Sequence, residues 1–320
     1  MNEISSKNTA ILLATFNGER FITEQLESLR TQTYQDFCCY IHDDGSDDGT
    51  VEIINLYCKQ YPDRFVFLGS EKTGGAASNF FMLMETVEAP YYLFCDQDDV
   101  WDPEKIQLVS NRMKEIEKNH PGQEILVHTD VRVVDERLRT ISNSYYSLLN
   151  QNPVSSNPLQ IIASNTVIGA TAMFNRKLRE TALGAITQSK LMFHDWLLAL
   201  ICSMTGIISY IDIPTVKYRQ HGNNEVGAHK RENTFQKAER RIREADISDF
   251  VKEHKSREVL RRNIAAAAVN AVPETSRDYA VVKSFSSIGE ENKLERLMFY
   301  IRNGIIRKSG ESILMQILFL

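Results

Sequence analysis

Apolar runs alternate with amphipathic stretches along the first hundred residues. Four short runs rich in branched or aromatic side chains predict buried strands at 9–15, 37–42, 65–68 and 91–95. Between them, apolar residues recur at helical spacing and predict helices at 21–29, 51–61 and 77–87. Strands that alternate with helices form βαβ units. We therefore predict an α/β fold with a Rossmann-like, mostly parallel sheet covered by helices on both faces.

The pattern is less regular further along. Strands are expected at 125–129, 131–134, 207–211 and 215–218, a helix at 194–204, and a region of helix or strand at 159–174. From about residue 233 charged residues dominate, and an alanine-rich stretch of helical composition follows. Residues 294–320 are amphipathic and basic. We divide the chain into an α/β domain at 1–230 and a helical region at 231–320.

Composition narrows the kinds of partner. The formal net charge of -5 argues against a chain-wide surface for nucleic acid, so we expect no nucleic-acid partner. The five cysteines form no C-x-x-C pair, and this suggests reduced thiols in a cytoplasmic protein rather than a zinc cluster or a disulfide framework. No apolar run approaches the roughly 20 residues that a membrane-spanning helix needs.

Polar clusters follow three of the predicted strands, after Thr15, His42 and Cys95. In parallel sheets ligands bind beyond the carboxyl ends of the strands, so these clusters should meet at one edge. Asp96 and Asp98 leave the fourth strand one residue apart, and carboxylate pairs of this kind bind hard divalent cations. The alternative is a solvated acidic turn before the next helix.

A second acidic turn, Asp43-Asp44-Gly45-Ser46, follows the strand at 37–42. A carboxylate there could accept a hydrogen bond from the imide N–H of a nucleobase. The alternative is a type I turn that caps a helix.

Four sequence blocks follow one another in the first third of the chain: Ala14-Thr15-Phe16-Asn17-Gly18, Gln32-Thr33-Tyr34, Asp43 to Thr50 (DDGSDDGT) and Asp96 to Trp101 (DQDDVW). This series resembles family-2 glycosyltransferases of the GT-A fold. Two later blocks, Phe193-His194-Asp195-Trp196 and Tyr218 to Asn224 (YRQHGNN), are similar to the rhamnosyltransferase-like branch of that family. The resemblance covers roughly residues 9–228 and makes 1–230 the catalytic domain.

The resemblance implies a nucleotide site at the first and second loops. Thr15, Phe16 and Asn17 would contact the base and ribose, and Asp44 would pair with the base. Asn79, in the glycine-rich loop before the third helix, would lie near the donor sugar or phosphates. For Asn79 the alternative is a helix start built on Gly and Ser.

The resemblance also implies a metal and a base. Asp96 and Asp98 would hold Mg²⁺ or Mn²⁺ against the diphosphate, with His221 as a third ligand or, alternatively, an ordinary loop histidine. Asp195 would be the general base, because an inverting transfer needs a group that takes the proton of the acceptor hydroxyl. The alternative makes Asp195 a first-turn acid stabilised by the helix dipole.

The resemblance implies an inverting glycosyltransferase that moves L-rhamnose from dTDP-L-rhamnose to a growing cell-surface polysaccharide or lipid-linked glycan. A UDP-hexose donor, or a non-catalytic nucleotide- or glycan-binding protein of the same fold, are the alternatives. A nucleotidyltransferase would need a glycine-rich basic signature after the first strand, which residues 16–20 match poorly. The amphipathic C-terminus could attach to the inner face of the plasma membrane, pack on the catalytic domain, or join a homo-oligomer.

Overall fold

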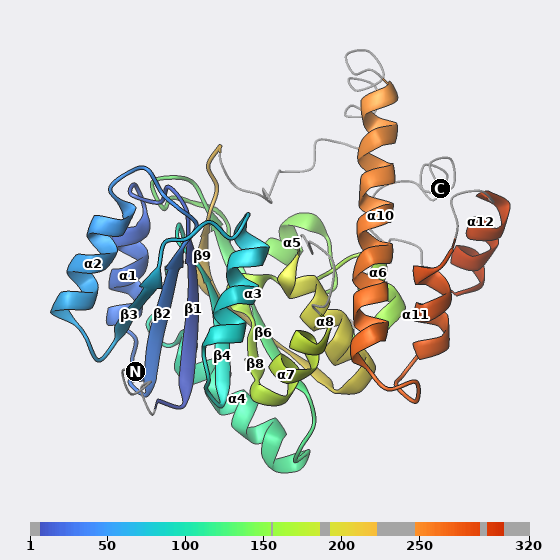
Figure 1. Ribbon diagram of the computed structural model, residues 1–320, viewed down its shortest axis with the longest axis horizontal. Helices are drawn as coiled ribbons and strands as arrows, with labels where there is room; N and C mark the ends of the chain where they lie inside the picture. Colours follow the sequence, from blue (N-terminus) through green and yellow to red (C-terminus); the bar gives the residue numbers. More distant parts are fainter. Residues whose placement is uncertain (1–6, 155, 186–192, 223–246, 289–292, 304–320) are drawn as a thin grey trace.

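The computed structural model describes residues 7–154, 156–185, 193–222, 247–288 and 293–303. Its centre is a nine-stranded mixed sheet with the order β3-β2-β1-β4-β8-β6-β9-β5, in which β7 pairs with β6 (Figure 1). The first four strands are parallel: β1 (Thr9–Thr15), β2 (Phe37–Asp43), β3 (Phe65–Gly69) and β4 (Tyr91–Asp96). The predicted βαβ units are therefore confirmed in this half.

The other half of the sheet changes direction. The short strand β8 (Met173–Asn175) runs antiparallel to both β4 and β6 (Ile125–Val134). The long strand β9 (Ile207–Arg219) lies parallel to β6, and it pairs antiparallel with β5 (Val100–Trp101). A further short strand, β7 (Thr140–Ser142), is antiparallel to β6. The α/β class is as predicted, but the sheet is parallel only in part. The sequence does not indicate the antiparallel strands, because strands of two or three residues leave no periodic signal.

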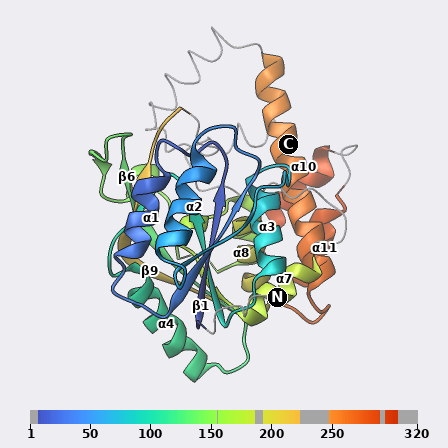
Figure 2. The ribbon, with the colours of Figure 1, turned by 60° about the vertical axis from the view of Figure 1, so that its left-hand side comes forward.

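Helices cover both faces of the sheet (Figure 2). One face carries α1 (Ile22–Arg30), α2 (Thr50–Gln60) and α4 (Lys105–Asn119). The other carries α3 (Ala76–Thr86), α6 (Pro158–Ala163), α7 (Arg176–Gly184) and α8 (His194–Thr205). Strand β1 supplies both cores in alternation, with Leu12 on the α3 side and Leu13 on the α1 side. This is why its sequence reads as an unbroken apolar run.

The C-terminal region is helical as predicted. It contains α10 (Ile247–Ala271), α11 (Tyr279–Ser286) and α12 (Lys293–Arg302), which lie on the side of the molecule opposite β3 (Figure 1). Helix α10 packs against α6, α7 and α8, and buried Ala265 and Phe285 join the same core as Leu198 of α8. The predicted boundary at 230/231 lies outside the described residues. Across the described ranges, none of the helices is both long enough and apolar enough to cross a membrane.

Strand β6 was predicted as two strands because Asp130 interrupts its apolar pattern. It is one strand with an irregular register against β9 at that point. Asp130 is only 1% exposed, and its Oδ1 accepts hydrogen bonds from the amides of Val131 (2.7 Å) and Tyr145 (3.1 Å). These hydrogen bonds offset the free-energy cost of burying a carboxylate inside a sheet. Strand β9 is likewise continuous where the sequence predicted two strands.

Candidate active site

The register of the parallel strands brings three loops together. Thr15 at the end of β1 pairs with Asp43 of β2, and its neighbour Ala14 pairs with Asp96 of β4. The hydroxyl of Thr15 donates a hydrogen bond to Oδ1 of Asp43 at 2.9 Å. The loops that follow Thr15, Asp43 and Asp96 therefore leave the same edge of the sheet, as the sequence predicts.

The loop after β1 is held from two sides. Gln97 brackets the peptide groups of Phe16: its Oε1 accepts from the Phe16 amide at 2.9 Å, and its Nε2 donates to the Phe16 carbonyl at 2.8 Å. The amide of Asn17 donates to the Ser46 hydroxyl at 2.8 Å, and Asn17 Oδ1 accepts from the Asp47 amide at 3.0 Å. Phe16 itself is 51% exposed, so a fixed backbone presents an open aromatic face at this edge.

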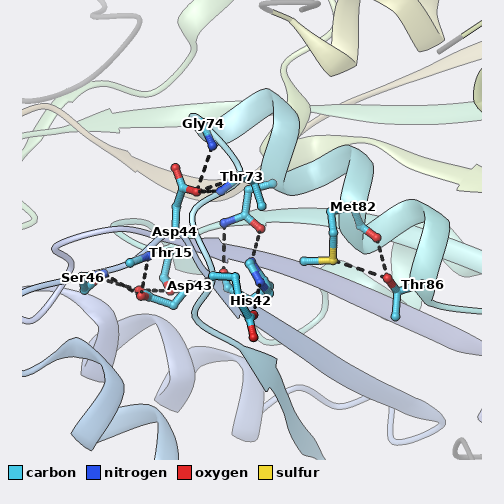
Figure 3. Close-up of polar contacts among 12 residues, drawn as sticks. Thr15, His42, Asp43, Asp44, Ser46, Thr73, Gly74, Met82 and Thr86 are labelled. Atoms are coloured by element: carbon cyan, nitrogen blue, oxygen red, sulfur yellow. Dashed lines mark hydrogen bonds and ion pairs between the residues drawn. The ribbon is translucent and has the colours of Figure 1, made fainter. Parts of the chain in front are cut away.

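Asp44 has a role that the sequence did not indicate. Its carboxylate accepts hydrogen bonds from the Thr73 amide, the Thr73 hydroxyl (2.8 Å), the Gly74 amide (3.2 Å) and the Gly75 amide (2.8 Å) (Figure 3). Burial alone would raise the pKa of Asp44, but these bonds outweigh it and the pKa is lowered. Because a carboxylate accepts about four hydrogen bonds, the loop at 73–75 already uses this capacity, and a base would have to displace one of these donors.

Asn79 does not face the ligand edge. It is 1% exposed, its Oδ1 lies 2.9 Å from Nδ1 of His42, and its Nδ2 donates to the His42 carbonyl at 3.1 Å. Both ends of the amide are therefore used inside the protein. This placement suits the structural alternative, a helix start, and the expectation that Asn79 lies near the donor sugar or phosphates stays a prediction.

The acidic loop meets the end of β9. Because β5 pairs with Val216 and Lys217, the residues before β5 come to lie beside those that follow β9. Oδ2 of Asp98 lies 2.7 Å from Nε2 of His221, and the exposed fractions of the two side chains are 17% and 10%. The imidazole also packs on Phe21, with ring centroids 4.9 Å apart. The predicted pair of Asp98 and His221 is thus in direct contact, with Asp96 two residues away at the end of β4.

The donor atoms at this loop suit a hard divalent cation. In the part of the chain that the structure describes, no three Asp, Glu, His or Cys side chains form a ready-made metal cluster. Mg²⁺ is usually held by one or two carboxylates together with substrate phosphates, rather than by a complete cage of protein atoms. Carboxylate oxygens of Asp96 and Asp98 and the imidazole nitrogen of His221 fit such an incomplete set, in which a diphosphate supplies the remaining oxygens.

Arg219 holds the acidic loop, residues 97–99, through hydrogen bonds. Its side chain is 1% exposed, and it donates from Nε to the Asp98 carbonyl at 2.7 Å, from Nη1 to the Glu136 carbonyl at 2.5 Å, and from Nη2 to Glu24. Its backbone amide donates to Oδ1 of Asp99 at 3.0 Å. Burial, and then the charges of Asp98 and Asp96, raise the pKa of Asp99 well above its ordinary value. Arg219 belongs to the YRQHGNN block, but nothing in the sequence indicates this role for it.

A buried lysine also lies near these acids. Lys105 is fully buried, its Nζ donates to the Ala170 carbonyl, and it lies 3.3 Å from the centre of the Trp101 ring. Burial lowers the pKa of Lys105 to about 7, although Cys95, Asp99 and Asp96 act in the opposite direction. The sequence offered no signal for it, because a lysine in the first turn of a helix usually faces solvent.

Asp195 lies in the first turn of α8, as predicted. Its Oδ1 accepts a hydrogen bond from the amide of Trp196 at 2.7 Å, and the Trp196 indole is fixed by donating to the Ile161 carbonyl at 2.7 Å. A Cβ atom at Gly169 would lie 3.5 Å from Cβ of Asp195. The carboxylate is therefore partly exposed and lies against a segment with no side chain at Gly169.

Two tyrosines connect Asp195 with the acidic loop. The rings of Tyr145 and Tyr218 meet edge to face, with centroids 6.3 Å apart. Burial raises the pKa of Tyr145, and the charge of Asp195 adds to this effect. Burial raises the pKa of Tyr218 too, followed by the charges of Asp99 and Asp96. Tyr145 thus lies near Asp195 and Tyr218 near the acids. The sequence alone indicates no function for Tyr145 or Tyr218.

Comparison with known proteins decides the family. The family model described as glycosyl transferase family 2 matches residues 10–181, more than half of the chain. The chain belongs to glycosyl transferase family 2. This glycosyltransferase is 30% identical over 224 residues to the dTDP-rhamnosyl transferase RfbG of Shigella flexneri, a match that covers 68% of this chain and 74% of that protein. The resemblance stated from the sequence, including its rhamnosyltransferase-like branch, is confirmed.

Solved structures confirm the GT-A fold of this family 2 glycosyltransferase. Residues 1–349 of Staphylococcus aureus TarS in complex with UDP give a TM-score of 0.52 at 18% identity, covering 92% of this chain and 87% of that one. The chain spans 53% of the longer TarS structure. The mannosyltransferase PcManGT of Pyrobaculum calidifontis, in complex with GDP-Man and Mn²⁺, gives 0.50 at 18% identity and covers 99% and 90% of the two chains. At this identity the likeness establishes the fold alone.

Proposed function

We propose that this glycosyltransferase moves L-rhamnose from dTDP-L-rhamnose to a growing cell-surface polysaccharide or lipid-linked glycan, with inversion at the anomeric carbon. The observation that supports the proposal most is the contact between Asp98 and His221, next to the loop after β1 that Gln97 holds. The similarity to RfbG supports rhamnose as the sugar.

The chain's own residues have distinct tasks in this proposal. The exposed ring of Phe16 stacks on the base, and Thr15 and Asn17 contact the nucleoside. Asp44 holds the loop at 73–75 by accepting hydrogen bonds from its amides. Asp195 accepts the proton of the acceptor hydroxyl while the oxygen of that hydroxyl attacks the anomeric carbon. The bond from that carbon to the diphosphate oxygen breaks, and dTDP leaves with the electron pair.

Asp96, Asp98 and His221 would hold Mg²⁺ or Mn²⁺. The cation would supply positive charge against the negative charge that develops on the departing diphosphate. Arg219 contributes by holding the peptide of Asp98, because a ligand set is effective only when its side chains are fixed in position.

Turnover of defined donors tests this function. Purified protein would be incubated with dTDP-L-rhamnose, UDP-glucose, UDP-N-acetylglucosamine and GDP-mannose, each with Mn²⁺, with Mg²⁺ or with EDTA. We expect release of dTDP from dTDP-L-rhamnose that depends on the metal. Metal-dependent release of UDP from a UDP-sugar would replace the donor assignment. Binding without any release would point to a non-catalytic protein of this fold.

A membrane contact is proposed for α12. Leu294, Met298 and Ile301 recur at positions i, i+4 and i+7, and they are 65%, 62% and 57% exposed. On the opposite face Tyr300 is 5% exposed and packs on Phe285, with ring centroids 5.8 Å apart. An apolar stripe on an anchored helix suits peripheral attachment at the inner face of the membrane, where a lipid-linked acceptor would reside. A second copy of the chain is the alternative occupant.

A further inference from the structure

A polar groove lies beside α5 (Tyr145–Leu149), apart from every residue assigned above to the nucleotide, the metal or the base. Its volume is about 360 Å³, which is within the range of small-ligand sites. Among the side chains that line it are two hydroxyls, two amides, a phenol and a carboxylate: Ser144, Ser147, Asn150, Gln151, Tyr210 and Asp212.

The chemistry of this lining selects for a neutral ligand rich in hydroxyl groups. Neither Lys nor Arg is among the described residues that line the groove, so nothing there would compensate the charge of a phosphate. Amides, hydroxyls and a carboxylate both donate and accept hydrogen bonds, as a sugar does. The ring of Tyr210 and the apolar surface of Pro153 suit the C–H faces of a pyranose. A nucleoside diphosphate would not be favoured in such a groove.

The groove and Asp195 lie on two sides of one residue pair. Tyr146 lines the groove, and its ring lies 5.5 Å from that of Tyr210 and 5.8 Å from that of Tyr145, edge to face in both cases. The Tyr146 hydroxyl donates to the Thr166 carbonyl, three residues before Gly169, where an added Cβ would lie 3.5 Å from Cβ of Asp195. The inner wall of the groove is therefore joined to the segment that lies against Asp195.

The wall between them is held in place. The Tyr146 hydroxyl donates to the Thr166 carbonyl at 2.5 Å, and Tyr146 is 3% exposed. At the start of α5, the Ser144 hydroxyl accepts from the Ser147 amide at 3.0 Å. At its end, Asn150 has a positive φ of 50° and caps the helix. A fixed wall can present a ligand to Asp195 in one register.

We propose that this groove binds the non-reacting sugar units of an acceptor oligosaccharide, so that its terminal unit extends past Tyr145 to Asp195. This inference rests on the proposed function, and it adds the place where the acceptor units that do not react are bound. The nucleotide residues follow β1 and β2, and the groove is lined by Tyr210 and Asp212 of β9, on the other half of the sheet.

Two variants change the groove without touching Asp195 or the acidic loop. Ser147→Trp places a large side chain in it. Asn150→Gly with Gln151→Ala removes both amides, and glycine keeps the positive φ of position 150 available. Asn143→Ala is the matched control, since it removes an exposed amide from the same loop outside the groove.

Binding would be measured by saturation-transfer NMR and calorimetry without donor, using tetrasaccharides of rhamnose, mannose and N-acetylglucosamine beside the matching monosaccharides. In at least one series the tetrasaccharide should bind wild type about tenfold or more tightly than the monosaccharide, as expected for a few added hydrogen bonds. Both groove variants should lose this advantage, and Asn143→Ala should keep it. Binding of dTDP and melting temperature serve as checks on the fold.

The outcomes separate this inference from the proposed function. No tetrasaccharide advantage in any series, or an advantage that survives Ser147→Trp, overturns the groove assignment even if sugar transfer is observed. A length-dependent affinity that both groove variants abolish supports it even if none of the four donors is turned over.

Discussion

Oδ2 of Asp98 lies 2.7 Å from Nε2 of His221, although 123 positions separate the two residues in the chain. The contact forms because Val100 and Trp101 pair with Lys217 and Val216, near the C-terminal end of β9. It makes the two side chains act as one unit in the proposed site.

Asp98→Asn and His221→Ala should each lower turnover by about 100-fold, the effect of removing one group that stabilises developing charge. Because the two residues act together, the double variant should fall little further than either single variant. Asp102→Asn is the control and should stay near wild type, because Asp102 follows β5 and pairs with Arg132 at 3.6 Å. Steady-state rates with Mn²⁺, beside melting curves, check this. Unaltered metal-dependent transfer by Asp98→Asn would refute the metal assignment.

Arg219 should be important for stability as well as for the site. Arg219→Met removes a buried guanidinium that donates to the carbonyls of Asp98 and Glu136 and to Glu24, and we expect a loss of about 2 kcal/mol or more in the free energy of unfolding. The control is Arg20→Met. Arg20 pairs with Glu136 at the surface, where its side chain is 65% exposed, so its removal should cost at most about 1 kcal/mol. Urea unfolding of the two variants should differ accordingly, and equal losses would contradict the role of Arg219.

The βα units near the N-terminus could be predicted within about a residue because each is long and periodic, and the parallel register then places the three loops at one edge. The mixed half of the sheet could not. Strands such as β5 and β8 are too short to show a period, and their pairing depends on residues more than 70 positions away. The sequence therefore indicated Asp98 and His221 as candidates but not the strand pair that brings them into contact.

A buried histidine should make the protein sensitive to acid. His128 is fully buried, its Nε2 has no hydrogen-bond partner within the described residues, and burial lowers its pKa to about 3. Below pH 6.5 the unfolded chain binds a proton that the folded protein excludes, so stability falls as the pH drops toward 3, by up to about 1.4 kcal/mol per pH unit. His128→Phe should lose this part of the slope.

The control for the histidine is Val127→Ala on the same strand. Val127 is also fully buried but carries no titratable group, so its substitution should lower the free energy of unfolding by the same amount at every pH. Chemical denaturation between pH 4 and 7 compares the three proteins. If His128→Phe keeps the wild-type slope, His128 is not buried in its neutral form.

The exposed stripe of α12 should decide membrane contact. Leu294→Glu with Met298→Glu should abolish sedimentation with vesicles that contain anionic lipid, because both side chains would enter the apolar boundary. Val259→Glu, at a 39% exposed apolar position on α10, is the control and should leave sedimentation unchanged. If vesicle binding persists in the α12 variant, or if the variant instead converts a dimer to a monomer, the stripe is not a membrane contact.

The sequence predicts backbone positions better than it predicts the directions of side chains. Asn79 lies in the first turn of α3 and its amide contacts His42, because a helix start in a glycine-rich segment can orient its first side chains inward or outward. Tyr145 belongs to no quoted motif, Tyr218 stands in the YRQHGNN block without a role indicated for it, and only the packing of α5 on β9 brings them together. Their link between Asp195 and the acids is a tertiary feature, which no local pattern encodes.

The most direct test of the central claim is the rate of sugar transfer by Asp195→Asn. Asparagine preserves size and can still accept the Trp196 amide, but it cannot take up the proton of the acceptor hydroxyl. We predict that transfer from dTDP-L-rhamnose falls by about 100-fold or more, a typical contribution of general base catalysis, while dTDP binding and melting temperature remain at wild-type values. Transfer by Asp195→Asn at the wild-type rate would contradict the account.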